Sequence, residues 1–268
     1  MNICDRLYVS TVAEDARDTA IEFGLGLELA EFCTAMNMDA PNPALPAEFN
    51  GFPYWDAVAK KNAAGIANRT FHAPFNELCP AAIDPRALEV ARGRFLQAAA
   101  LAAGYGAKKM VVHSGFVPLV YFKDYFVERS TEFWRELLAD IPAELALALE
   151  NVLESEPCLT TEIVRRVNSP RLRLCLDIGH ANTIVSATPV LSWIDTMAPY
   201  LGHVHLHNNY REYDHHNPLG NGQIDMDAAM ARLTSVCDTD CTFVIESLDA
   251  RSSALWLRER GYIQKREG

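Results

Sequence analysis

Short segments rich in β-forming apolar residues alternate with longer segments of helical periodicity along the whole chain, and this alternation restricts the fold more than any other feature. We expect eight strands, each followed by a helix, at Leu7–Thr11, Gly26–Glu31, Arg69–His72, Lys109–His113, Leu145–Glu150, Leu172–Asp177, His203–His207 and Thr242–Glu246. The clearest helical segments are Pro85–Ala103, Phe126–Ala139, Leu159–Val167, Met226–Val236 and Ser252–Arg260. Asp84 and Asp225 stand where helix N-caps are expected.

Eight strand–helix units in 268 residues average about 33 residues each, which suits βαβ repeats. The pattern predicts one α/β domain over residues 1–268, a closed (β/α)8 or TIM barrel. A doubly wound sheet would need a glycine-rich turn after the first strand, and residues 10–15 contain no glycine. Cys33–Gly51 is long for a barrel connection, so it is either a functional lid or a surface loop.

Composition narrows the function classes. The chain has 24 Lys and Arg against 35 Asp and Glu, and this net charge of −11 opposes non-specific binding to nucleic acid. No apolar run is long enough to span a membrane, and the N-terminus lacks the apolar core of a signal peptide. The 7 cysteines are scattered, without a C-x-x-C pair, as expected for reduced thiols. We therefore expect a cytoplasmic protein.

Side chains of metal-ligand type end six successive expected strands. They are His72, His113, Glu150, Asp177 with His180 close behind, His205 and Glu246. One histidine after a strand is usually a hydrogen-bonded loop residue, but a carboxylate at the end of an apolar strand is rare unless it is paired or metal-bound. Because the carboxyl ends of all strands meet on one face of a parallel barrel, we expect a metal site there.

The seventh expected strand carries three histidines at alternate positions, His203, His205 and His207. Their side chains share one face of the strand, yet one strand cannot usually place all three on one ion. We assign His203 either to packing of the barrel interior or to supporting a ligand without binding the ion itself. In the loop that follows, Asp214 and His216 either bind a second ion or form a polar turn, and the residues alone leave both readings open.

Taken together, these motifs resemble those of the xylose-isomerase-like barrel superfamily, which holds sugar isomerases, ketose 3-epimerases and endonuclease IV. The resemblance extends from the His-Ala-Pro-Phe segment at 72–75 to Glu246. The segment His216–Asp225 is especially similar to the seventh loop of the bacterial sugar (phosphate) isomerase/epimerase group. The motifs are specific for the superfamily but not for the reaction.

Two branches of that superfamily imply different roles for the same residues. Resemblance to the epimerases implies one divalent metal on Glu150, Asp177, His205 and Glu246, with substrate contacts from Glu156, His180 and Arg211. Resemblance to endonuclease IV implies three zinc ions, with His72, His113, His180, Asp214 and His216 as additional metal ligands. Every position is filled under either reading.

The loops favour a small substrate over bent DNA, because they carry few basic residues. They offer aromatic residues instead, which either line a pocket or form a seam between outer helices; these are Phe49, Phe52, Tyr54, Trp55, Phe116, Tyr121 and Phe122. We therefore favour a metal-dependent isomerase or epimerase of a sugar or sugar phosphate, with Glu150 and Glu246 as the acid–base pair around an enediolate.

Two alternatives stay open: a zinc phosphodiesterase that cleaves DNA at abasic sites, and a sugar-binding relative without turnover. The ion is Mn, Mg, Co or Zn, because oxygen-rich ligand sets suit the first three and extra histidines favour zinc. The sequence leaves open the identity of the sugar, its phosphorylation, the choice between isomerisation and epimerisation, and whether the chain forms a homo-oligomer.

Overall fold

Eight parallel strands close into a barrel in the order β1 to β8, and β1 pairs with β8. The structure is a computed structural model and describes residues 2–44 and 51–264. The strands are β1 (Leu7–Ser10), β2 (Gly26–Leu29), β3 (Arg69–His72), β4 (Lys109–His113), β5 (Ala146–Glu150), β6 (Leu172–Asp177), β7 (Leu201–Leu206) and β8 (Thr242–Ile245). Every strand expected from the sequence is present. The largest difference is in β7, which begins two residues early and ends before His207.

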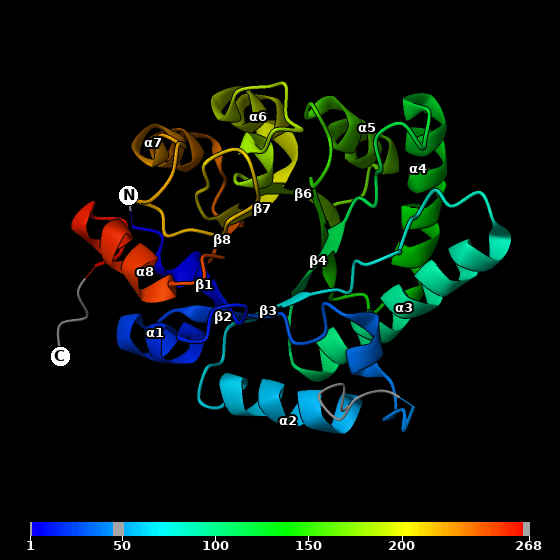
Figure 1. The fold of residues 1–268 in the computed structure, drawn as a ribbon, viewed down its shortest axis with the longest axis horizontal. Helices are drawn as coiled ribbons and strands as arrows, with labels where there is room; N and C mark the ends of the chain where they lie inside the picture. Colours follow the sequence, from blue (N-terminus) through cyan, green and yellow to red (C-terminus); the bar gives the residue numbers. More distant parts are fainter. Residues whose placement is uncertain (1, 45–50, 265–268) are drawn as a thin grey trace.

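Helices surround the strands on the outside (Figure 1). They are α1 (Ala16–Phe23), α2 (Phe52–Ala63), α3 (Pro85–Gly104), α4 (Lys123–Asp140), α5 (Cys158–Val167), α6 (Val190–Met197), α7 (Met226–Val236) and α8 (Ala250–Glu259). The expected (β/α)8 barrel is therefore confirmed. Within the described ranges, no helix combines the length and the apolar composition that crossing a membrane requires.

The register of the strands sets the height of each side chain in the barrel. His113 pairs with Glu150 across β4 and β5, and Asp177 pairs with His205 across β6 and β7. The register between β6 and β7 shifts at Leu174 and Cys175, so that β7 advances by one residue relative to β6. This irregularity brings His205 level with the carboxylate that ends β6.

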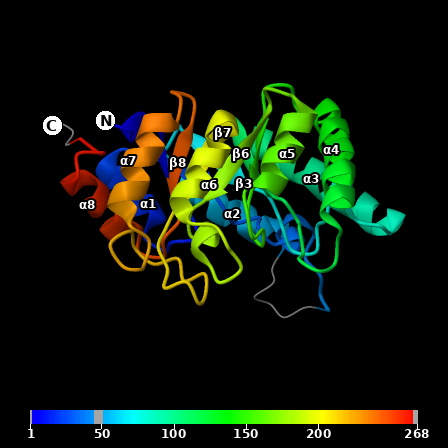
Figure 2. The same cartoon turned by 90° about the horizontal axis from the view of Figure 1, so that it is seen from above.

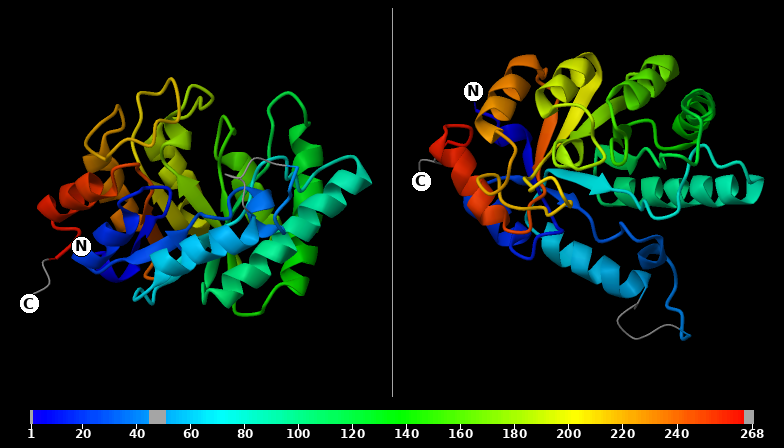
Figure 3. Two further views of the ribbon diagram at one scale, coloured as in Figure 1. Left: turned by 60° about the horizontal axis from the view of Figure 1, so that its bottom comes forward. Right: turned by 45° about the horizontal axis from the view of Figure 1, so that its top comes forward.

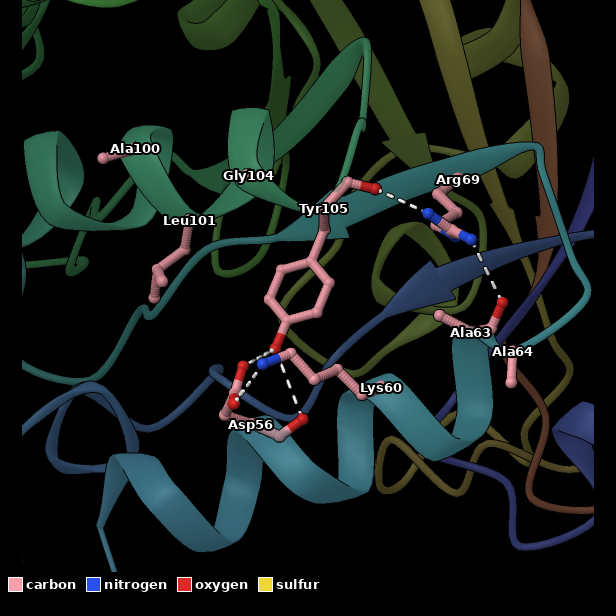
Figure 4. A pocket seen from close by; sticks show the side chains of 9 residues that line it. All are labelled: Asp56, Lys60, Ala63, Ala64, Arg69, Ala100, Leu101, Gly104 and Tyr105. Carbon is pink, nitrogen blue, oxygen red and sulfur yellow. Dashed lines mark hydrogen bonds and ion pairs between the residues drawn. The ribbon is translucent and has the colours of Figure 1, made fainter.

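Figure 4 shows the cavity between α2 and α3, about 410 Å³ in volume, whose polar groups are largely satisfied by one another. The Tyr105 hydroxyl donates to Asp56 Oδ1 at 2.6 Å, and Lys60 pairs with Asp56 at 2.7 Å. Arg69 of β3 donates to the carbonyl oxygens of Tyr105 and Ala63. These contacts connect β3, α2 and α3. We therefore interpret the cavity as part of the packing between these elements and not as a ligand site.

Two expectations about the outer elements need correction. The helix expected at Phe126–Ala139 begins at Lys123, because Phe122 has an extended backbone and takes the N-cap position. Phe52, Tyr54 and Trp55 were expected in a loop but lie on α2, where Pro53 occupies the first turn of the helix. Phe49 and part of the Cys33–Gly51 segment lie outside the described residues.

Asp84 and Asp225 cap α3 and α7 as expected, and Asp84 Oδ1 accepts the backbone N–H of Arg86 at 2.8 Å. We predict that Asp84→Ala lowers the free energy of unfolding by about 0.5–2 kcal/mol, because a backbone donor of the first turn loses its acceptor. Thermal unfolding measures the change. The control is Asp84→Asn, which keeps a side-chain acceptor; an equal loss in both variants would contradict a capping role.

Candidate metal centre

Three carboxylates and one imidazole meet at the carboxyl ends of four neighbouring strands. Glu150 ends β5, Asp177 ends β6, His205 lies near the end of β7 and Glu246 follows β8. We call these four residues the tetrad. All four are buried, and one ligand atom from each lies within 4.8 Å of the others. The Nδ1 atom of His205 lies 2.9 Å from Glu246 Oε2, 3.2 Å from Glu150 Oε1 and 3.6 Å from Asp177 Oδ2.

A second group lies against the other oxygen of Glu150. His72 Nε2 is 3.3 Å and His113 Nε2 is 3.2 Å from Glu150 Oε2. The two histidines end β3 and β4, so the carboxylate of Glu150 stands between them and His205. The two oxygens of Glu150 thus face two different groups of histidines, each of which could hold a metal ion.

A third group forms around Asp214 in the loop after β7. Asp214 Oδ2 lies 2.8 Å from His216 Nε2 and 3.1 Å from His180 Nε2. Figures 2 and 3 show this loop, in yellow and orange, on the same side of the barrel as the loop after β6 that carries His180. The two loops bring together residues that are 34 positions apart in the sequence.

Asn208 anchors the loop that carries this third group. Its side-chain nitrogen donates to the carbonyl oxygens of Leu219 and Ile224, at 2.9 Å and 3.2 Å. Its side-chain oxygen accepts the backbone N–H of Ile224 at 3.0 Å. A two-residue bridge with Asn217 closes the base of the loop. Asp214 and His216 therefore project from an ordered segment.

Three histidines of these groups point one ring nitrogen at a backbone carbonyl and the other at a carboxylate. The Nδ1 atoms of His72, His180 and His216 lie 2.8–2.9 Å from carbonyl oxygens, which can only accept. In a neutral ring the proton therefore resides on Nδ1, and Nε2 presents a lone pair to a carboxylate oxygen. The Nε2 lone pair and the carboxylate oxygen are both acceptors, so they repel each other unless a cation or a proton lies between them. The donor set thus fits divalent metal ions.

The charges at the tetrad lead to the same conclusion. Burial opposes ionisation of Glu150, yet His113 and His205 hold its pKa well below the usual value. Burial likewise opposes ionisation of Asp177, and His180 and His207 lower its pKa. Both carboxylates are therefore charged at neutral pH, and buried charges require partners. A divalent cation bound among these side chains would supply the positive charge that the buried carboxylates require.

No pattern in the sequence singled out Glu28, a buried carboxylate in the middle of β2. Its Oε1 and Oε2 atoms each lie 3.0 Å from a histidine, His205 Nε2 and His203 Nε2 respectively. The placement of His203 agrees with its expected packing role. The neighbouring His207 also stays outside the tetrad, with Nε2 at 3.0 Å from both oxygens of Asp177.

Two of the three predicted substrate-binding residues make their polar contacts away from the tetrad. Glu156 is about half exposed and forms an ion pair with Lys123. Arg211 is exposed, with a guanidinium nitrogen 3.5 Å from the carbonyl oxygen of Ser186. The third residue, His180, touches the tetrad, since its Nδ1 lies 3.4 Å from Glu150 Oε1.

The loop after β4 forms the wall of an apolar cavity of about 570 Å³. Phe116, Tyr121 and Phe122 line it, together with Leu153 and Val185 from the loops after β5 and β6. These three aromatic residues were expected either to line a pocket or to join outer helices. They line a pocket, and Phe116 and Tyr121 also pack against Phe126 of α4. The cavity lies beside loops that follow strands of the tetrad.

The fold and the site define a (β/α)8 protein with a polar centre suited to metal ions at the strand ends. The chain belongs to the xylose isomerase-like TIM barrel family, whose sequence profile matches residues 25–263.

Among proteins of known sequence, an uncharacterized protein of Methanocaldococcus jannaschii (MJ1311) is 27% identical over 175 residues, which cover 62% of this chain and 59% of that protein. The match thus spans about three fifths of the length of that relative.

Solved structures share the fold. The TTHB071 protein from Thermus thermophilus, soaked with ZnCl2, is 23% identical, with 96% of this chain and 98% of that chain covered and a TM-score of 0.73. A D-tagatose 3-epimerase-like protein is 21% identical, with 95% and 96% covered and a TM-score of 0.71. D-psicose 3-epimerase from Clostridium cellulolyticum, solved with D-tagatose, is 17% identical, with 97% and 100% covered and a TM-score of 0.68.

Gly179 leaves room for the ring of His207, since a Cβ atom added there would lie 1.8 Å from His207 Cε1. We predict that Gly179→Ala destabilises the protein by about 1–3 kcal/mol, because the ring must move off Asp177. Urea unfolding measures the loss. The control is Gly93→Ala in α3, where nothing lies within 4 Å and stability should stay equal or rise. Equal behaviour of the two variants would show that the ring adapts freely.

Proposed function

We propose that this protein is a metal-dependent isomerase or epimerase of a sugar or sugar phosphate, with Glu150 and Glu246 as the proton-transferring pair. The observation that carries the proposal is the convergence of these two buried carboxylates on one atom, His205 Nδ1, at 3.2 Å and 2.9 Å. Reactions of this class remove a proton from the carbon atom next to a carbonyl group and then return a proton to carbon. They need one group to accept that proton and one to return it.

The tetrad would hold the ion through its three carboxylates and the Nδ1 atom of His205. A divalent ion held there would supply Lewis acidity toward a carbonyl group of the substrate. Glu150 or Glu246 removes the proton from the neighbouring carbon, and the other carboxylate returns it. His180 lies beside Glu150, with its Nδ1 atom 3.4 Å from Oε1, and we retain it as a predicted substrate contact.

The charge around the site supports a small substrate. Arg211 is the one Lys or Arg residue in the described loops that follow β3 to β8 before the next helix begins. Binding to a nucleic acid backbone requires several Lys or Arg contacts to phosphate. The apolar cavity beside the loop after β4 suits a small molecule better than a phosphate backbone. The family of the chain and its epimerase-like neighbours in fold are consistent with sugar chemistry.

A second candidate function, phosphodiester hydrolysis with three ions, is favoured by one specific observation. The groups around Glu150 Oε2 and around Asp214 carry histidines whose Nε2 atoms face carboxylate oxygens, at 2.8–3.3 Å. Those contacts would complete two further metal sites beside the tetrad. In that case Glu150 would link two ions and position a hydroxide for attack on phosphorus.

We predict that Glu150→Gln and Glu246→Gln each lower turnover by about 10²- to 10⁴-fold, the usual contribution of a general acid or base. The assay is incorporation of solvent deuterium into a panel of ketoses and aldoses, free and phosphorylated, followed by mass spectrometry. Circular dichroism should show an unchanged fold.

The control is Glu154→Gln, at a buried glutamate that accepts hydrogen bonds from Ser114 and the backbone N–H of Val152. It should cost stability and leave exchange intact. Near wild-type exchange in either tetrad variant would remove that residue from proton transfer. Absence of exchange from the wild type with every sugar would count against the proposed reaction.

The metal content separates the two functions. Under the proposed function, elemental analysis of protein purified without added metal should find about one ion per chain, and a chelator should lower the melting temperature because the tetrad carboxylates then repel one another. Replacing both Asp214 and His216 by Asn should leave that content unchanged.

Three zinc ions per chain in the wild type, two in the double variant, and cleavage of abasic DNA by the wild type at catalytic concentrations would instead establish the phosphodiesterase. Unchanged stability and activity after verified metal removal would contradict both functions.

A further inference from the structure

Glu28 is fully buried in the barrel interior beneath the tetrad, at 0% exposure. It lies on β2, and its carboxylate reaches across to two histidines of β7. Oε1 lies 3.0 Å from His205 Nε2, and Oε2 lies 3.0 Å from His203 Nε2. Thr70, its partner in the β2–β3 register, donates its hydroxyl proton to Oε2 at 2.9 Å. Oε2 thus accepts hydrogen bonds from Thr70 and His203, whereas Oε1 has the imidazole of His205 as its ion-pair contact.

A carboxylate at this position is costly. The interior of a (β/α)8 barrel is normally filled by layers of branched aliphatic side chains. Transfer of a carboxylate from water into such an interior costs several kcal/mol even after the protein relaxes, and contacts with partners only offset that cost. An aliphatic residue would fill the same volume without it. The position of Glu28 therefore points to a role that an apolar side chain cannot perform.

The two edges of the His205 ring reveal that role. Nδ1 faces the carboxylates of Glu150 and Glu246, and Nε2 faces Glu28. A carboxylate accepts a proton and does not donate one when ionised, so Glu28 favours the tautomer of His205 that carries its proton on Nε2. In that tautomer Nδ1 has a free lone pair directed at the centre of the tetrad.

His203, which contacts Glu28 Oε2, is itself fixed by hydrogen bonds. His203 bonds through Nδ1 to the Thr242 hydroxyl at 2.6 Å, and the Lys109 ammonium donates to the same hydroxyl at 2.6 Å. A line of polar contacts therefore runs down the barrel from His205 through Glu28, His203 and Thr242 to Lys109. The ring of His205 is fixed by this line from below rather than by the tetrad alone.

We propose that Glu28 is a positioning residue for the metal centre: it holds the Nε2 proton of His205 and presents the Nδ1 lone pair to a divalent ion bound by the tetrad. This inference rests on the metal centre of the proposed function and is independent of the substrate. A carboxylate behind a ligating imidazole fixes the orientation of the ring and makes the ligand more basic. Glu28 touches neither substrate nor ion.

The test compares Glu28→Gln with Glu31→Gln. Glu31 is also buried, lies three residues further along the chain, and accepts from Asn62 at 2.8 Å rather than contacting the tetrad. The dissociation constant for zinc is measured for each protein by competition with a chromogenic chelator, with no sugar present. We expect Glu28→Gln to weaken zinc binding by about 10- to 100-fold and Glu31→Gln to leave it within about twofold.

A second measurement needs no variant. In the zinc-loaded wild type, long-range ¹H–¹⁵N correlation of the histidine rings should show His205 protonated on Nε2 and unprotonated on Nδ1. This spectrum decides the question if Glu28→Gln fails to fold.

The outcomes are separable. Unchanged zinc affinity in a folded Glu28→Gln protein, or a His205 ring protonated on Nδ1, would overturn the positioning role and leave the proposed function standing. A fall in stability of the metal-free variant without a change in zinc affinity would reduce Glu28 to a structural role. Failure of the wild type to bind zinc, manganese, cobalt or magnesium would overturn the metal centre and this inference together.

Discussion

The desolvation of three carboxylates around one imidazole is the constraint on which the rest of the site depends. Glu150 and Asp177 have no contact with bulk water that could stabilise their charge, so neighbouring groups must do so. Histidines surround the carboxylates, and backbone carbonyls fix the rings of several of those histidines. Asn151 ties the ends of β5 and β6 together, because its side chain bonds to both the N–H and the carbonyl of Asp177. The polar network is therefore a consequence of burying the tetrad.

The barrel makes that burial geometrically possible. Each tetrad residue sits at the end of a strand that is hydrogen-bonded to the next, so the positions of the four side chains are set by the strand register and not by loop conformation. The register shift between β6 and β7 adjusts this arrangement by one residue. A site built on strands holds the distances between its ligand atoms within a narrow range. A metal centre requires such precise placement of its ligands.

The sequence was sufficient for the strands and for the convergence of the tetrad residues on one face of the barrel, because both follow simple rules. The role of the four residues as one ligand set came from the family resemblance and stays a prediction. Apolar runs mark the strands, and a carboxylate or histidine at the end of such a run must face the loop side of a barrel. Glu28 was not identified as a functional residue because it lies inside its strand, in the run Gly-Leu-Glu-Leu. In such a run, alternation of apolar and polar residues predicts that the glutamate faces solvent. Glu156 and Arg211 were assigned as substrate contacts by their offsets along the chain. An offset does not determine the direction in which a loop side chain points, so these two assignments stay predictions. The start of α4 was missed because Phe122 has no side-chain capping group.

The polar centre contains residues held by two different parts of the fold, the strands and one loop. The tetrad belongs to the barrel itself, whereas Asp214 and His216 belong to a loop that Asn208 fastens at its base. Insertion, deletion or exchange of that loop would alter the third group of ligands while the strands stayed in register. The polar group around Asp214 is therefore structurally separable from the tetrad: a change confined to one loop alters that group and leaves the barrel core as it is.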